Sequence, residues 1–244
     1  MTSTPLPLQW AGERVWLCPE RALWWPAAQT LFVADVHLGK AAAYRVQGQP
    51  VPAGTTDENL ARLDTLLMHY PVKRLVFLGD LMHAPQGVTP SLLMRVAQWR
   101  DRHAATEMLL VRGNHDLRAG DPPAELGVTV VDEPWPLGPF TACHHPQRLP
   151  GRFVLAGHLH PAVTLSGPAR DRVRLPCFCV DQTDPLPDQV GELGSHAQAG
   201  LAILPAFGAF TGTWGVRAAP GRQVYAVGAG AVWAVPISGA AAGG

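Results

Sequence analysis

The chain has 244 residues, which is enough for one sizeable hydrophobic core and close to the upper end for a single domain. Its 19 basic and 19 acidic residues give a formal net charge of zero, so any binding of nucleic acid must come from a local patch. The chain shows no signal-peptide pattern and no apolar run near the ~20 residues of a membrane-spanning helix, so we expect a cytoplasmic protein without membrane contact.

Apolar strand-like runs alternate with two helical patterns in the first half of the chain. Leucines recur at helical spacing in residues 56–69, behind a cap signal at Thr55 and Thr56. Apolar residues recur in the same way in residues 90–103. Alternation of strands and helices is typical of a parallel sheet with helices outside.

After Gly127 the pattern changes to short apolar runs separated by glycine and proline, which predicts a second, mostly antiparallel sheet. These runs lie at residues 128–131, 140–143, 163–165, 173–175, 201–204, 224–227 and 232–235. Two sheets sharing one core explain both halves without a linker, so we expect a single domain over residues 1–237. Residues 181–200 are polar and rich in glycine and proline, which indicates a long mobile loop, and residues 238–244 are expected to be a disordered tail.

Four short strings combine carboxylate, imidazole and amide groups directly after expected strands. The strands are the apolar runs at residues 31–33, 75–78, 108–111 and 153–155. Because the carboxyl ends of strands in an open α/β sheet line one crevice, side chains far apart in sequence can meet there. The strings are Asp35-Val36-His37, Gly79-Asp80, Gly113-Asn114-His115-Asp116 and Gly157-His158-Leu159-His160. Divalent Mn, Fe or Zn accepts such mixed oxygen and nitrogen ligands, so a metal site is predicted.

Asp80 follows a glycine that permits a tight turn, so its carboxylate could lie between two cations about 3.5–4 Å apart. Such a pair of cations generates hydroxide near neutral pH and neutralises a phosphate during in-line attack. His115, beside the candidate ligand Asn114, could stabilise the developing charge or protonate the leaving group. Asp116 would then orient His115 or hold the loop.

The motifs D-x-H, G-D, G-N-H-D/E, H and G-H-x-H occur in this order, and the chain thereby resembles the calcineurin-like metallophosphoesterase superfamily. The resemblance implies an α/β fold in which two mixed β-sheets pack as a sandwich flanked by helices. It also implies two divalent metal ions, with Mn²⁺ favoured over Fe or Zn. Metal ligands implied by the resemblance are Asp35, His37 and His160 for the first ion, Asn114, His158 and one further histidine for the second, and Asp80 for both.

The further histidine must be His144 or His145. In similar proteins this ligand closes a strand just before a histidine or glutamate and a proline. The pattern favours His144 as the metal ligand and leaves His145 beside it, as a candidate for substrate binding.

Other charged or polar residues near the motifs are candidates for substrate binding. Lys40 and Arg45 follow the first ligand pair and could hold a phosphate next to the scissile one, although solvated loop charges are an equal alternative. His83 could orient Asp80 or the substrate. Arg148 and Arg152 could contact a nucleic-acid backbone, but solvation at the rim is favoured for both.

Longer strings resemble the bacterial DNA-ligase-associated metallophosphoesterases over residues 31–212. This family implies a DNA endonuclease or phosphodiesterase of the DNA damage response, with an ATP-dependent DNA ligase, an exonuclease and a helicase as partners. The strings are Asp35-Val36-His37-Leu38-Gly39-Lys40-Ala41, Gly79-Asp80-Leu81-Met82-His83, Gly157-His158-Leu159-His160-Pro161, Leu175-Pro176-Cys177-Phe178 and Leu204-Pro205-Ala206-Phe207-Gly208.

Two other functions stay open at this point. Similar sites hydrolyse small phosphodiesters or nucleotide pyrophosphates, although the lipid-linked nucleotide hydrolases tend to carry arginine where His115 stands. Some members of the fold are non-catalytic scaffolds in larger complexes, but those usually lose ligands, and this chain has lost none. The sequence therefore favours a two-metal phosphodiesterase that acts on DNA.

Overall fold

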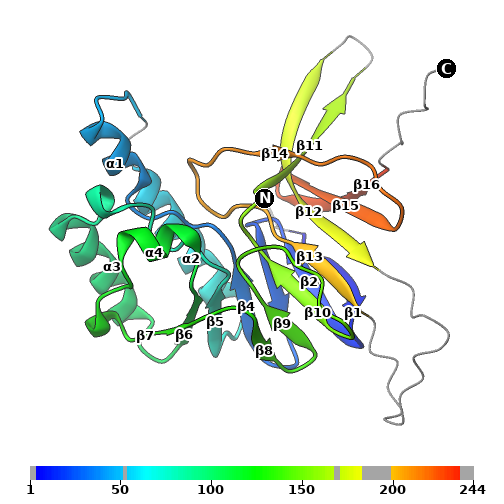
Figure 1. Ribbon diagram of the computed structural model, residues 1–244, viewed down its shortest axis with the longest axis horizontal. Coiled ribbons are helices and arrows are strands. Elements are labelled where there is room, and N and C mark those ends of the chain that lie inside the picture. Colours follow the sequence, from blue (N-terminus) through cyan, green and yellow to red (C-terminus); the bar gives the residue numbers. More distant parts are fainter. Residues whose placement is uncertain (1–3, 52–53, 168–170, 183–198, 237–244) are drawn as a thin grey trace.

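The computed structural model describes residues 4–51, 54–167, 171–182 and 199–236. Two β-sheets pack against each other, and helices cover the outer face of the first sheet (Figure 1). Both sheets are mixed, which confirms the expected α/β fold class. Of the loop predicted at 181–200 only the two ends are described, and the tail predicted at 238–244 lies outside the described residues.

The first sheet has seven strands in sequential order. The pairings from the first to the fourth strand are antiparallel, and those from the fourth to the seventh are parallel. These strands are β1 (Leu6–Trp10), β2 (Glu13–Cys18), β3 (Ala22–Trp25), β4 (Thr30–Val33), β5 (Arg74–Phe77), β6 (Glu107–Val111) and β7 (Val128–Val131). β4, β5 and β6 are largely buried because both faces are covered, which explains their nearly continuous apolar sequences.

Helices α2 (Thr55–His69) and α3 (Pro90–Arg102) pack their apolar faces on this sheet and agree with the two predicted helical patterns. The Thr89 hydroxyl caps α3 by accepting a 3.2 Å hydrogen bond from the backbone N–H of Leu92. The cap predicted for α2 was wrong, because that helix begins directly after Gly54 without a side-chain cap. Shorter elements are α1 (Lys40–Val46), α4 (Asn114–Ala119), and the 3-10 turns η1 (Pro85–Gly87) and η2 (Ala124–Leu126). None of the helices in the described ranges is long and apolar enough to cross a membrane.

The second sheet has the strand order β14-β11-β12-β13-β10-β9-β8, with β15 between β12 and β16. Its strands are β8 (Trp135–Leu137), β9 (Phe140–Ala142), β10 (Phe153–Ala156), β11 (Pro161–Ser166), β12 (Arg172–Gln182), β13 (Gly200–Ile203), β14 (Trp214–Gly215), β15 (Arg222–Gly228) and β16 (Ala231–Val235). Most of its strand pairs are antiparallel, as expected, and the pairs β9–β10, β10–β13 and β11–β14 are parallel. β7 was expected in this sheet but pairs with β6 in the first, since a short crossover through α4 and η2 returns the chain there.

Large aromatic side chains fill the space between the two sheets. Trp10 stacks on Phe153 with ring centroids 5.3 Å apart, and Trp25 meets Phe140 edge to face at 5.1 Å. Beyond the strand ends, a parallel bridge joins Ala34, after β4, to Ala206, after β13. This bridge brings the carboxyl ends of strands from both sheets to one place, where the predicted metal ligands lie.

Candidate metal centre

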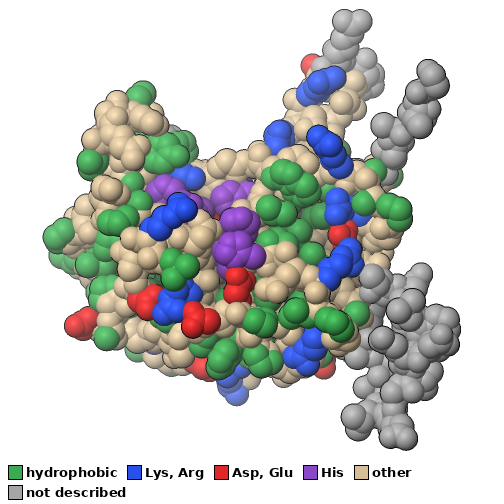
Figure 2. All heavy atoms as spheres, in the orientation of Figure 1, with side chains coloured by type: hydrophobic (Ala, Val, Ile, Leu, Met, Phe, Trp, Pro, Cys, Tyr) green, Lys and Arg blue, Asp and Glu red, His purple; other side chains and the backbone are tan. Residues whose placement is uncertain are grey.

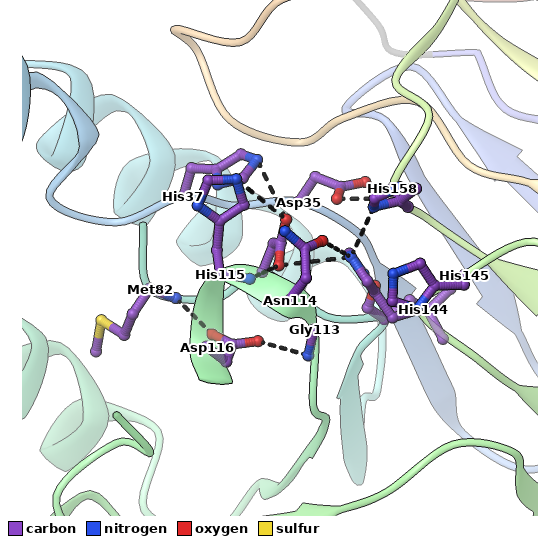
Figure 3. A network of polar contacts seen from close by, with 12 residues as sticks. Asp35, His37, Met82, Gly113, Asn114, His115, Asp116, His144, His145 and His158 are labelled. Carbon is purple, nitrogen blue, oxygen red and sulfur yellow. Dashed lines mark hydrogen bonds and ion pairs between the residues drawn. The ribbon is translucent and has the colours of Figure 1, made fainter. Parts of the chain in front are cut away.

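The seven predicted metal ligands lie together where strands of both sheets end, and several of them are labelled in Figure 3. They come from segments that follow β4, β5, β6, β9 and β10. They are Asp35, His37, Asp80, Asn114, His144, His158 and His160. Figure 2 shows histidine side chains gathered at the surface in this region, between the helical part and the second sheet.

Five of these residues have a left-handed backbone. The angle φ is 56° at Asp35, 50° at His37, 53° at Asp80, 70° at His158 and 51° at His160. Residues with a Cβ rarely adopt this conformation, which costs on the order of 1 kcal/mol or more for each residue. Backbone strain of this kind concentrates at functional sites, and here it accompanies the turn that aims each side chain inward.

Two glycines of the motifs allow the chain to pass close to these side chains. A Cβ atom on Gly79 would lie 2.0 Å from Nδ1 of His144, and a Cβ atom on Gly113 would lie 2.3 Å from Oδ1 of Asp80. Both distances are steric overlaps. The glycine in each motif is therefore required by the packing of a neighbouring candidate ligand.

The first group of ligands, the His144 cluster, consists of His144, Asn114 and His158. Nε2 of His144 lies 3.0 Å from Oδ1 of Asn114, 3.1 Å from Nδ1 of His158 and 3.5 Å from Oδ1 of Asp80. Nδ1 of His144 lies 3.0 Å from the carbonyl oxygen of Leu78. A carbonyl can only accept, so Nδ1 carries the proton and Nε2 presents a lone pair.

Burial lowers the pKa of His144 and His158, which keeps both rings neutral and able to bind a metal. Lone pairs of His144, Asn114 and Asp80 thus converge on one point. A cation at that point would satisfy all three groups.

The second group, the His160 cluster, consists of Asp35, His37 and His160. Nε2 of His160 lies 3.3 Å from Nε2 of His37 and 3.4 Å from Oδ1 of Asp35. Nδ1 of His160 faces the carbonyl oxygen of Gly212 at 3.0 Å, which leaves Nε2 directed at the cluster. Burial lowers the pKa of His37. Burial acts in the same direction on His160, but the hydrogen bond and charge of Asp35 outweigh it and raise the pKa of that ring.

Asp80 connects the two clusters. Its Oδ1 atom faces His144, whereas its Oδ2 atom lies 3.8 Å from Nε2 of His37. Asp80 is 2% exposed and Asp35 is 0% exposed, and in the described part of the chain their ion-pair partners are histidines rather than lysine or arginine. Burial raises the pKa of Asp80, because a buried carboxylate without a strong counter-charge is costly. The donor set fits divalent Mn, Fe or Zn.

The structure brings both His144 and His145 to this region, and the ligand atoms of these two and His158 lie within 4.8 Å of one another. The His144 ring is fully buried among the other ligands. The His145 ring is 46% exposed, and its Nδ1 lies 2.5 Å from Oε1 of Glu133. The contacts of His144 with Asn114 and His158 favour it over His145 as the metal ligand.

Glu133 was missed by the sequence analysis. Its Oε2 atom accepts hydrogen bonds from the backbone N–H groups of His144 and His145, at 2.7 and 2.9 Å. It lies in a short connection between β7 and β8 and belongs to no motif, so no local signal marks it.

His115 lies at the edge of the two clusters. Its Nε2 atom is 4.0 Å from Oδ2 of Asp80, and its Nδ1 atom is 2.7 Å from the carbonyl oxygen of His83. The ring stacks on that of His83, with centroids 4.6 Å apart. Nδ1 of His83 in turn lies 3.3 Å from Nδ1 of His37, so His83 supports both rings. Burial, with a smaller contribution from Lys40, lowers the pKa of His83 to about 4.

Asp116 is fully buried, and its carboxylate accepts hydrogen bonds from backbone N–H groups. It accepts hydrogen bonds from the N–H groups of Met82, at 2.9 Å, and Gly113, at 3.0 Å (Figure 3). These contacts tie the loop after β5 to the loop after β6. Of the two roles expected for Asp116, they favour holding the loops, because the contact that orients His115 comes from the His83 carbonyl.

The basic candidates for substrate binding are spread over different surfaces. Lys40 begins α1 at the edge of the clusters. Burial lowers its pKa, and the nearby charges of Asp80 and Asp35 act in the opposite direction. Arg45 lines a separate pocket of about 240 Å³, which none of the predicted ligands lines. Arg148 donates to Asp181 at 3.1 Å and Arg152 to Thr141 at 2.9 Å.

Known proteins include a nuclease of similar sequence and structure. No protein-family model and no curated protein matches the chain. Among solved structures, the chain is similar to the nuclease MPE of Pseudomonas putida, with 42% sequence identity and a TM-score of 0.76. The match covers 95% of this chain and 100% of that chain.

Proposed function

Because the chain belongs to the family of the Pseudomonas putida nuclease MPE, we propose that it is a metal-dependent phosphodiesterase that cleaves DNA. The observation that carries this proposal is the position of Asp80, whose two carboxylate oxygens face two separate groups of buried nitrogen and oxygen donors. A single carboxylate between two such groups is the arrangement expected for a two-metal hydrolytic site.

Two divalent cations would be held by the two clusters. One would bind Asp35, His37 and His160, and the other Asn114, His144 and His158, with Asp80 shared. Mn²⁺ is the proposed ion, and Fe and Zn also suit these ligands. When bound, such cations supply an activated water and neutralise charge on the phosphate.

The residues around the clusters position these ligands and act on the substrate. The carbonyl of Leu78 and the carboxylate of Glu133 fix His144 through its ring and its backbone N–H. His115 presents Nε2 beside Asp80, where it would protonate the leaving oxygen or stabilise the charge on the phosphate. Lys40 would hold a phosphate that flanks the scissile one.

We further propose a role in DNA repair, beside an ATP-dependent DNA ligase, an exonuclease and a helicase. It is supported by the resemblance of the sequence strings to the DNA-ligase-associated metallophosphoesterases. Cleavage inside a strand, as an endonuclease, is part of the same proposal.

A substrate panel tests the proposed function. The purified protein with Mn²⁺ is incubated with single-stranded, nicked and duplex DNA, a 2′,3′-cyclic nucleotide and a bis-aryl phosphodiester. We expect DNA cleavage that requires the metal and stops on chelation, and that is absent from an Asp80→Asn preparation purified in parallel. Hydrolysis of the cyclic nucleotide without DNA cleavage would replace the proposal with a small-molecule phosphodiesterase, and inactivity on every substrate would indicate a scaffold.

A further inference from the structure

A row of four aromatic rings leads away from the candidate metal centre. His115 stacks on His83 at a centroid distance of 4.6 Å, His83 lies 5.9 Å from Tyr44, and Tyr44 meets Phe210 edge to face at 5.7 Å. The four rings come from α4, the loop after β5, α1 and the loop between β13 and β14. The row therefore depends on the tertiary fold and on no single sequence motif.

Lys40 lies beside the outer end of this row. Its Nζ atom is 5.9 Å from the ring centroid of Tyr44 and 5.9 Å from that of Phe210. Lys40 also lies near the carboxylates of Asp80 and Asp35. An ammonium group and two aromatic rings thus lie together beside a site proposed to bind phosphodiesters.

Tyr44 and Phe210 are not part of the hydrophobic core. Both side chains are half-buried, and in the described part of the chain neither belongs to a core cluster. Large aromatic side chains that contribute to no core and remain partly exposed next to a site have surface available for a ligand.

The loop that carries Phe210 is fixed on both sides of that residue. The N–H of Ala209 donates to Oδ1 of Asn59 at 2.9 Å, and the N–H of Gly208 donates to the Asp35 carbonyl at 3.1 Å. After Phe210, the carbonyl of Gly212 lies 3.0 Å from Nδ1 of His160. The same backbone that positions two candidate metal ligands therefore also positions the Phe210 ring.

We propose that Tyr44 and Phe210 form a stacking subsite for one nucleobase next to the scissile phosphate, with Lys40 on the adjoining phosphate. Every nucleobase has a π-face that stacks on aromatic side chains, so such a subsite takes any base. A base inside a duplex is already stacked on both sides. The subsite would thus require the strand to be unstacked at the position of cleavage. This inference rests on the proposed function.

The test combines removal of a ring with removal of a base. The substrate is a single-stranded oligonucleotide with one cleavable phosphodiester, and all of its remaining linkages are phosphorothioates. Matched oligonucleotides carry an abasic site on the 5′ or the 3′ side of the cleavable bond. The proteins are the wild type, Tyr44→Leu, Phe210→Leu and Tyr44→Trp, with Val46→Ala as a control, since Val46 lies in the same helix and is 70% exposed.

In the wild type, removal of the base on one side of the bond should raise KM about 5- to 150-fold, the range expected for loss of one stacked base. Tyr44→Leu and Phe210→Leu should raise KM for the full oligonucleotide and respond little to removal of that base. Tyr44→Trp keeps an aromatic ring and should retain the dependence on that base, whereas the control Val46→Ala should behave as the wild type. All variants should cleave the matching abasic oligonucleotide as the wild type does.

The subsite would be overturned if ring removal and base removal raised KM independently, so that their free-energy effects added. Groups that contact each other give non-additive changes. Insensitivity of the wild type to both abasic sites would also overturn it. Both results require a wild type that cleaves the full oligonucleotide. A wild type that retains its metal but cleaves no oligonucleotide would instead contradict the proposed function.

Discussion

The backbone N–H of His115 donates a 2.9 Å hydrogen bond to Oδ1 of Asp80, so the loop after β6 fixes the carboxylate presented by the loop after β5. The bond uses the main chain, and the ring of His115 remains directed at Oδ2 of the same carboxylate from 4.0 Å. Backbone and ring can therefore be tested separately, because a substitution at position 115 removes only the ring.

Substitution of Asp80 should separate charge from hydrogen bonding. Asp80→Asn keeps an oxygen that accepts from His115 but removes the negative charge shared by both clusters. We expect turnover to be lost and the metal content to fall from two ions per chain to one or fewer, with the fold retained. Elemental analysis and thermal unfolding measure the two effects. Asp57→Asn, a change at an exposed carboxylate paired with Arg95, serves as the control. Two tightly held ions in Asp80→Asn would contradict the bridging role.

Substitution of the two neighbouring histidines, His144 and His145, should have effects of different severity on metal binding. His144→Ala should abolish binding at the second metal site, because Nε2 of His144 is the atom on which Asn114 and His158 converge. His145→Ala should lower metal affinity or activity only ~10–100-fold, as expected for a group that supports a ligand. Titration with Mn²⁺ compares the two proteins. Loss of the second ion in His145→Ala but not in His144→Ala would show that the ligand is the adjacent residue.

Much of the site was predictable because each motif follows a strand end, and the strands of an α/β sheet end in one crevice. The helices α2 and α3 were predictable as well, since each is long enough to show a repeating apolar face. Helices α1 and α4 are too short for that. The membership of β7 in the first sheet was not predictable, because a run of valines suits either sheet.

The residues that sequence analysis missed are those that reach the site only through tertiary structure. Glu133 contacts His144 from a connection between two strands, and Phe210 contacts Tyr44 from a loop near the other end of the chain. Neither belongs to one of the motifs that carry the candidate ligands. Motif spacing therefore gave the candidate ligands but not the groups that orient them.

Gly79→Ala should damage the metal centre without a change to any candidate ligand. The added Cβ would lie 2.0 Å from Nδ1 of His144, so the ring would have to move away from Leu78 and Asn114. We expect loss of the second metal ion and of activity. Gly48→Ala is the matched control, since Gly48 has φ of 75° against 80° at Gly79 but has no atom within 4 Å of the added Cβ. Equal effects of the two substitutions would attribute the damage to backbone strain.

The ring of His115 should act on the leaving group, so His115→Ala should lower turnover while both metals are retained. General acid catalysis contributes ~10²–10⁴-fold, and an acidic leaving group needs little protonation. The loss should therefore be large on DNA and small on a bis-aryl phosphodiester. Metal content is expected to stay at two ions, because the backbone bond to Asp80 survives the substitution. Leu117→Ala, at a residue of the same helix that is 70% exposed, controls for changes in α4.

The two substrates distinguish the possible roles of this ring. Equal losses on DNA and on the aryl substrate would assign His115 to charge stabilisation on the phosphate, since that charge develops with either leaving group. Loss of a metal ion would remove both roles and place His115 among the ligands, where its Nε2 atom would have to approach from its present 4.0 Å distance to Asp80. A selective loss on DNA with two ions bound is the result that the position of the ring predicts, because the ring lies beside the clusters and its side chain is 28% exposed to solvent.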